Sequence, residues 1–177
     1  SLAGGSEGNS IATFAENLST CLTDLGLSTP LLSDVDVTPE RLRGRKLVLL
    51  PLNPSVPAGI LPALRDFVEQ GGRLMTFYSL PDDIADLIGV RKGEYIRPEG
   101  GPYAGMARVG EGLPGQPEFV GQGSWNIQVA YPIPGRSRTV AVWRTGDGRD
   151  TDLPALVVSE QGAHMGHVWL TDDWSGK

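Results

Sequence analysis

Residues 46–78 limit the fold more than any other part of the chain, because their apolar periodicity changes twice. Residues 46–51 are almost continuously apolar, which is typical of a strand covered on both faces in a parallel sheet. In residues 57–70 the apolar side chains recur at helical spacing, and a Gly-Gly pair follows as a helix-ending signal. Residues 73–78 return to strand character. The segment therefore predicts two parallel strands joined by a helix in a right-handed crossover.

Length and charge restrict the class of protein and its partners. A chain of 177 residues with 40% hydrophobic residues suits one folded domain, residues 1–177. The net charge of −6 and the scattered lysines and arginines leave no basic stripe, so we expect no nucleic-acid partner. No apolar run reaches the roughly 20 residues that a membrane span needs, so we expect no membrane contact.

The first third of the chain predicts a loop, a helix and a short strand. Residues 1–10 read as a loop that ends at an N-cap, either Asn9 or Ser10, and residues 11–25 carry one apolar helical face. The short apolar piece 30–32 is a candidate second strand. A domain of this class normally places a strand before its first helix, so we expect that the chain was cut from a longer protein or that this strand is degenerate.

The chain divides into three parts by pattern. Residues 1–89 form the α/β core, residues 90–123 read as a loop-rich insertion, and residues 124–177 are rich in alternating strands separated by turn signals. The predicted fold is α/β, with a doubly wound, mostly parallel flavodoxin-like sheet and an antiparallel or mixed β extension in the C-terminal third.

Four stretches of this sequence resemble the class I glutamine amidotransferase-like fold: LPLNPSVP, FVEQGGRLMTFYSLPDDIADLIGV, VAVWRTGDG and LPALVVSEQGAHMGHVWLTDD. The variant most similar is the non-catalytic one in the trimerisation domain of some β-galactosidases and in N-terminal domains of glycosyl hydrolase-like proteins. The resemblance implies an accessory or assembly domain of a larger carbohydrate-active protein. It also implies other domains of the same polypeptide, a homo-oligomer or carbohydrate as partners, and a secreted or periplasmic location.

The chemistry of an active amidotransferase does not carry over to these residues. Such an enzyme needs a thiolate on the turn after a sheet strand, paired with a histidine, but that turn here is Tyr78-Ser79-Leu80. Cys21 lies within a predicted helix, and His164 is not followed by the family's acid. We therefore predict no catalytic residue and no cofactor. Ser79 is the best-placed hydroxyl, so a hydrolase that uses Ser79 with His164 or His167 is an alternative.

A binding module is a second alternative. In an open α/β sheet, ligands gather at the carboxyl ends of strands and at the loop before a helix, which here gives Asn53, Ser79, Gly5 and Ser6 as candidate ligand-binding residues. Aromatic faces in the β-rich part could also stack on sugar rings. The aromatic candidates are Trp125, Tyr131, Trp143, Trp169 and Trp174.

The sequence predicts no metal site. His164 and His167 are three residues apart in a predicted strand, so they should point to opposite faces. The acidic loop with Asp147, Asp150 and Asp152 lacks the later bidentate acid of a calcium loop and reads as an exposed hairpin. The adjacent carboxylates Asp172 and Asp173 near the C-terminus are most simply expected to lie in solvent. Acid/base chemistry or sugar binding by these two side chains is the alternative.

Overall fold

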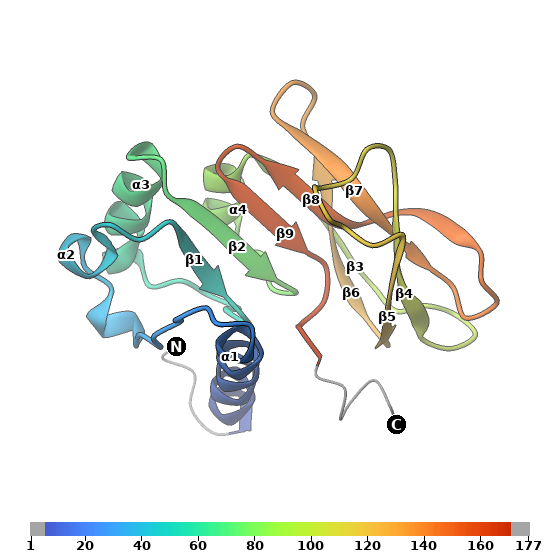
Figure 1. The fold of residues 1–177 in the computed structure, drawn as a ribbon, viewed down its shortest axis with the longest axis horizontal. Coiled ribbons are helices and arrows are strands. Elements are labelled where there is room, and N and C mark those ends of the chain that lie inside the picture. The colour runs from blue at the N-terminus through green and yellow to red at the C-terminus, as the bar shows by residue number, and fades with distance from the viewer. Residues whose placement is uncertain (1–5, 171–177) are drawn as a thin grey trace.

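The computed structural model describes residues 6–170, with side chains from Ser10 onward (Figure 1). In that part of the chain a helical N-terminal third is followed by a long β-rich region. The helices are α1 (Ser6–Asp24), η1 (Asp34–Asp36), α2 (Pro39–Leu42), η2 (Ala58–Ile60), α3 (Leu61–Glu69) and α4 (Asp82–Ile88). The strands are β1 (Leu47–Leu50), β2 (Arg73–Phe77), β3 (Val90–Ile96), β4 (Tyr103–Arg108), β5 (Phe119–Ser124), β6 (Ile127–Pro132), β7 (Ser137–Arg144), β8 (Asp150–Ser159) and β9 (Gly162–Met165).

The predicted strand–helix–strand unit is confirmed. β1 and β2 are parallel, with Leu49 opposite Met75, and α3 connects them. Leu64 and Phe67 are buried on the inner face of α3. Gly71 follows the helix with φ +87°, a conformation that residues with a Cβ avoid, so the chain can reverse there into β2.

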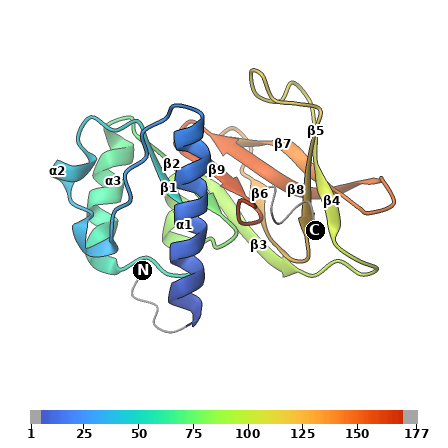
Figure 2. The same cartoon turned by 60° about the horizontal axis from the view of Figure 1, so that its bottom comes forward.

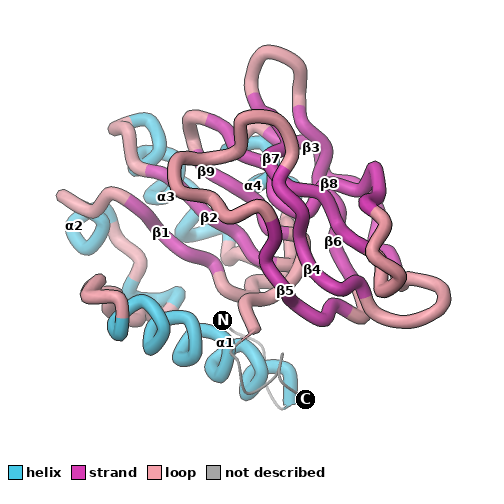
Figure 3. Tube along the Cα trace, turned by 45° about the vertical axis from the view of Figure 1, so that its right-hand side comes forward, coloured by secondary structure: helices cyan, strands magenta, loops and turns pink. Residues whose placement is uncertain are grey.

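The prediction of a doubly wound, mostly parallel flavodoxin-like sheet is wrong. The main sheet has the order β1-β2-β9-β8-β7-β4-β5, and only β1, β2 and β9 run parallel. From β9 outward each neighbour is antiparallel, and the sheet curls strongly (Figure 3). The short connections 145–149 and 160–161 explain this arrangement, because parallel neighbours would need a crossover of a dozen residues or more.

The region 90–123 contains more regular structure than its sequence indicates. It holds three strands, of which β3 pairs antiparallel with β6 in a separate two-stranded sheet. β4 and β5 extend the main sheet beyond β7. The glycines and prolines that predicted a loop lie mainly in the connections 97–102 and 109–118, which are the long loops of this region.

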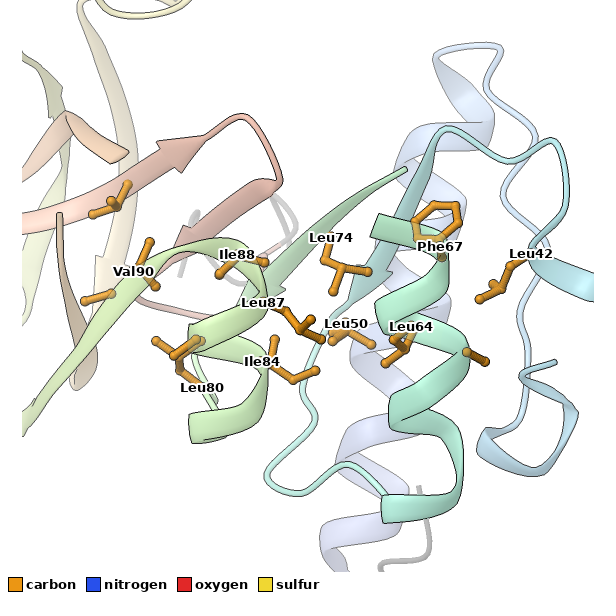
Figure 4. Close-up of a cluster of buried hydrophobic side chains, with 14 residues drawn as sticks. Leu42, Leu50, Leu64, Phe67, Leu74, Leu80, Ile84, Leu87, Ile88 and Val90 are labelled. Carbon is orange, nitrogen blue, oxygen red and sulfur yellow. The ribbon is translucent and has the colours of Figure 1, made fainter. Parts of the chain in front are cut away.

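Helices cover both faces of the parallel strands (Figures 1 and 2). On one face, α3 and α4 pack on alternate side chains of β1 and β2, including Leu50 and Leu74 (Figure 4). On the other face, Leu18 of α1 belongs to a second core with Phe77 and Trp143. The two cores lie on opposite sides of the sheet because successive strand residues point in opposite directions.

Two local predictions for the first third of the chain are wrong. α1 begins at Ser6, so residues 6–9 are helical and the N-cap is neither Asn9 nor Ser10. Residues 30–32 form no strand. Thr38 caps α2, accepting a hydrogen bond from the Arg41 N–H at 3.4 Å. Within residues 6–170, no helix is long and apolar enough to cross a membrane.

Candidate functional site

The turn after β2 holds a strained residue at the carboxyl end of the parallel strands. Tyr78 has φ +59°, the one non-glycine residue with positive φ among residues 6–170. The Ser79 N–H donates to the Phe77 carbonyl at 2.7 Å, which closes a three-residue γ-turn around Tyr78. Such a conformation costs about 1–3 kcal/mol and persists only where the surroundings enforce it. The Tyr78 N–H donates to the Met165 carbonyl at 2.8 Å, which ties the turn to β9.

The Tyr78 ring brings three separate parts of the chain together. Its centroid lies 6.0 Å from the Tyr95 ring of β3 and 5.8 Å from the His167 ring after β9, both in edge-on geometry. Burial, followed by a hydrogen bond to Tyr95, raises the pKa of Tyr78. The hydrogen bond from the Tyr78 hydroxyl, with a smaller contribution from Arg97, lowers the pKa of Tyr95.

His167 and Trp143 form the buried wall beside this ring. His167 Nδ1 lies 3.2 Å from Gln122 Nε2 and 3.1 Å from the Val168 carbonyl oxygen, and burial lowers the pKa of His167. The Trp143 ring packs edge-on against His167 with 6.5 Å between centroids. Trp143 is fully buried, and its Nε1–H has no hydrogen-bond acceptor within the described part of the chain. An unpaired buried donor of this kind costs about 1–3 kcal/mol.

His164 lies in a different environment and is fully bonded. Its Nε2 lies 3.0 Å from the Gln128 carbonyl oxygen, which can only accept, so Nε2 carries the proton. Nδ1 therefore accepts from the Thr76 hydroxyl at 2.8 Å. Burial lowers the pKa of His164 to about 4. The ring is a neutral cross-link between β2, β9 and the second sheet.

Ser79 is not paired with either histidine in the described part of the chain. Ser79 is half-buried next to the strained turn, but within residues 6–170 neither histidine forms a hydrogen bond with its hydroxyl. Without an imidazole partner a serine hydroxyl is not nucleophilic at neutral pH. The structure thus places Ser79 in the predicted turn, and among residues 6–170 its hydroxyl has no hydrogen bond to an imidazole.

The other candidate ligand residues do not converge on one place that the structure describes. Asn53 lies half-buried in the loop after β1. Ser6 is the first residue of α1, and Gly5 lies outside the described residues. Cys21 is half-buried in α1. Asp172, Asp173 and Trp174 also lie outside the described residues.

The acidic hairpin 145–150 is held by ion pairs. Asp147 accepts from Arg149 Nε at 2.8 Å, and Asp150 from Arg144 Nε at 2.6 Å. Hydrogen bonds to Thr145 and to Arg144 lower the pKa of Asp147 and of Asp150, respectively. These carboxylates neutralise arginines at the surface. Among residues 6–170 no group of three or more His, Cys, Asp or Glu side chains is placed to hold a metal ion.

The predicted aromatic side chains fall into different environments. Trp143 is core, and Trp169 packs against the same core. Tyr131 lies under the Arg91 guanidinium, 4.5 Å from its ring centroid, and donates to Glu94. Only Trp125 of the four described candidates is largely exposed, at 68%.

Sequence reasoning missed Tyr78, Tyr95 and Gln122. Tyr78 stood inside the predicted turn, but its strain is a property of the backbone that no residue pattern encodes. Tyr95 and Gln122 lie in the region expected to be loop, and they reach Tyr78 and His167 only through the strand pairing of β3 and β5. Residues 90–96 read VRKGEYI and show no clear alternation of apolar and polar side chains, so no sequence signal marked Tyr95 as part of a strand.

Comparison with known proteins yields structural neighbours but no sequence family. No family model matches the chain, and no curated protein matches it. A ThuA-like protein from Bacteroides uniformis ATCC 8492 matches 89% of this chain and 76% of its own length, with 15% identity and a TM-score of 0.64.

Two β-galactosidases share the fold over part of their length. The enzyme from Bacillus circulans sp. alkalophilus matches 74% of this chain with 17% identity and a TM-score of 0.57. The enzyme from Rahnella sp. R3 matches 75% with 16% identity and a TM-score of 0.55. This chain spans 21% of the length of each. At such identities the likeness establishes the fold: the chain has the architecture of a ThuA-like protein and of a minor part of these β-galactosidases.

Proposed function

We propose that this chain is a non-catalytic accessory or assembly domain of a larger carbohydrate-active polypeptide. The observation that carries the proposal is the fold match to about one fifth of each of two β-galactosidases. The hydrogen bonding of His164 supports a non-catalytic role, because both ring nitrogens are already used inside the fold. The strained turn after β2 supports it as well, since Tyr78 and not a cysteine occupies the strained position.

The test compares the full encoded polypeptide with the same polypeptide lacking residues 1–177 and with the 177-residue chain alone. Nitrophenyl glycosides and esters report hydrolysis, and light scattering after size-exclusion chromatography reports assembly. We expect the chain alone to be inactive and the deletion to lower the oligomeric state or the thermal stability of the remainder. Hydrolysis by the chain alone that is lost in Ser79→Ala would contradict the proposal and favour the hydrolase alternative.

Carbohydrate binding is a second candidate function, favoured by an exposed aromatic and cationic surface beside the strained turn. Tyr95 is 46% exposed and Trp125 is 68% exposed. Because Ile96 pairs with Ile127, Arg97 and Trp125 lie at the same end of the β3–β6 ribbon. Aromatic faces next to a guanidinium suit the apolar faces and hydroxyl groups of a sugar.

Calorimetric titration with soluble polysaccharides tests this second candidate. Trp125→Ala should weaken binding at least about tenfold if the indole stacks on a sugar, a loss of about 1.4 kcal/mol. Phe119→Ala is the matched control, because Phe119 is an exposed aromatic at the opposite end of β5. Equal binding by both variants, or no heat with any polysaccharide, would remove this candidate.

A further inference from the structure

A cleft of about 650 Å³ opens at the amino ends of the three parallel strands. Its lining includes Leu47, Arg73 and Gly162, the first residues of β1, β2 and β9. The volume lies within the range of about 300–1,000 Å³ that is usual for small-ligand sites. α1 packs on this side of the sheet near the carboxyl ends of the strands, where Leu18 and Phe77 share the second core (Figure 1). The cleft therefore occupies the part of the sheet that α1 leaves uncovered.

Strand pairing builds the floor of the cleft from one row of side chains. Arg138 of β7 pairs with Val158 of β8. Val158 pairs in turn with Ala163 of β9, and Ala163 pairs with Met75 of β2. Paired residues on neighbouring strands point to the same face, so the four side chains form a line across the sheet. Arg73 points to this face as well, because it lies two residues before Met75.

The two arginines stand at opposite ends of an apolar floor. The row crosses three spacings between strands of about 4.8 Å each, so the backbones at its two ends lie roughly 14 Å apart. Arg136 also lines the cleft, and Glu160 is the one carboxylate among the described residues that line it. Three arginines and one glutamate give the lining a net charge of +2, in a chain whose net charge is −6. A concentration of positive charge in a cleft attracts anions.

The guanidinium groups of Arg73 and Arg138 keep donors available for a ligand. Arg73 Nε donates to the Glu160 carbonyl at 3.2 Å, and Arg138 Nη2 donates to the Gly112 carbonyl at 2.8 Å. Within residues 6–170 neither guanidinium forms an ion pair, and most of the five N–H donors of each have no acceptor. Such groups bind carboxylates through two parallel N–H···O bonds.

The walls of the cleft are fixed by hydrogen bonds within the fold. The loop between β4 and β5, which contributes Leu113, lies in front of the sheet in Figure 3. Gln116 holds this loop, since its side chain accepts from the Leu113 N–H at 2.8 Å and donates to the Val140 carbonyl at 3.1 Å. Beside β9, the Ser159 hydroxyl accepts from the Gly162 N–H at 3.1 Å. A preformed site of this kind reduces the cost of ordering on binding.

We propose that this cleft binds an elongated organic anion with carboxylate groups near both ends and C–H groups between them. The two carboxylates pair with Arg73 and Arg138, and the C–H groups lie on the floor of Val158, Ala163 and Met75. Short oligosaccharides of uronic acids and linear aliphatic dicarboxylates share this chemistry. The proposal does not rest on the proposed function, because it uses only the cleft, its charges and the strand register.

Calorimetric titration of the 177-residue chain at low salt tests the proposal with two matched pairs of probes. The first pair is trigalacturonate and neutral galactotriose, and the second is sebacate and decanoate, which share a ten-carbon chain. We expect at least one of the two polyanions to bind at least about tenfold more tightly than its matched probe. Binding of trigalacturonate alone assigns the site to acidic sugars, and binding of sebacate alone assigns it to aliphatic dicarboxylates.

Three variants locate the binding. Arg73→Gln and Arg138→Gln should each weaken it at least about tenfold, because each removes the cation at one end of the ligand. Arg65→Gln is the matched control, since Arg65 is an exposed cation of α3 that does not line the cleft. Urea denaturation checks that each variant folds, and Arg73→Gln alone suffices if loss of the Arg138 bond to Gly112 unfolds the loop.

Three results would overturn the proposal. They are no binding of either polyanion, equal affinity for a polyanion and its matched probe, and equal affinity of Arg73→Gln and Arg65→Gln for the polyanion. Trp125→Ala should bind as the wild type does, because Trp125 does not line the cleft. A loss of binding in Trp125→Ala with none in Arg73→Gln would move the site to the exposed aromatic surface. None of these results depends on hydrolysis or assembly, so this proposal and the proposed function fail separately.

Discussion

Acidification should destabilise this protein through His164, at pH values where most of its carboxylates are still ionised. The ring is 1% exposed and accepts from Thr76 while donating to the Gln128 carbonyl, so it is held neutral. Its pKa of about 4 in the folded chain lies below the ordinary value of 6.5. Between these two pKa values the unfolded chain therefore binds a proton that the folded chain does not bind. The free energy of unfolding falls as the pH drops below 6.5.

The size of the effect follows from the two pKa values. They differ by about 2.5 units, 6.5 minus 4, and each unit is worth about 1.4 kcal/mol. The contribution of neutral His164 to the free energy of unfolding should be fully present at pH 7, and the free energy of unfolding should be lower by about 3 kcal/mol at pH 4. Exposed carboxylates such as Glu94 have lowered pKa values, so their contribution is lost mainly below about pH 4.5. Between pH 6.5 and 4.5 the change in the free energy of unfolding therefore comes mainly from the two histidines.

Urea denaturation followed by tryptophan fluorescence at pH 7, 6, 5 and 4.5 measures the effect. His164→Gln keeps one donor and one acceptor but cannot titrate, so its free energy of unfolding should change much less across this interval. His167→Gln is the matched control, because burial also lowers the pKa of His167, which should therefore contribute a separate part of the slope. A pH dependence in His164→Gln equal to that of the wild type would refute the reasoning.

Two further perturbations test the packing of β9 and the tyrosine pair. Gly162→Ala should destabilise the protein by roughly 1–3 kcal/mol in urea denaturation, because a Cβ there would overlap with the Leu74 carbonyl oxygen. Gly123→Ala, with open space around the new methyl group, should change stability far less, and equal losses would contradict this packing argument. Tyr78→Phe should raise the pKa of Tyr95 toward its ordinary value of 10, because the hydrogen bond that most lowers this pKa is removed. Ultraviolet titration of the phenolates measures the change. An unchanged Tyr95 titration would exclude the bond.

The predictions that succeeded depend on local signals. Residues 46–78 carry apolar periodicities that match a strand, a helix and a strand, and the structure places β1, α3 and β2 there. Gly71, with φ +87°, follows α3 as the predicted Gly-Gly helix end requires. These features rest on contacts between residues close in sequence, which a pattern of side chains can encode.

The sheet order could not be predicted because it depends on contacts between distant segments. β9 joins β2 across nearly 90 residues, with Thr76 opposite His164, and its strand-like composition does not specify which edge it joins. The sequence predicted a mostly parallel core sheet with an antiparallel or mixed extension in the C-terminal third, but it did not predict that β9 joins the parallel pair directly at β2. The antiparallel hairpins formed by β7, β8 and β9 then continue the main sheet beyond three parallel strands, so the sheet as a whole is mixed.

The sequence by itself determined the central parallel pair, the helix that connects it and the absence of cysteine from the turn after β2, because composition and periodicity act over a few neighbouring residues. Only the tertiary structure decided that Tyr78 is strained, that the His164 ring is hydrogen-bonded between Thr76 and Gln128, and that β1 is the edge strand of the main sheet among residues 6–170. Each of these depends on which segments far apart in the chain pair with one another. A strand's own residues encode its tendency to pair but not the identity of its neighbour.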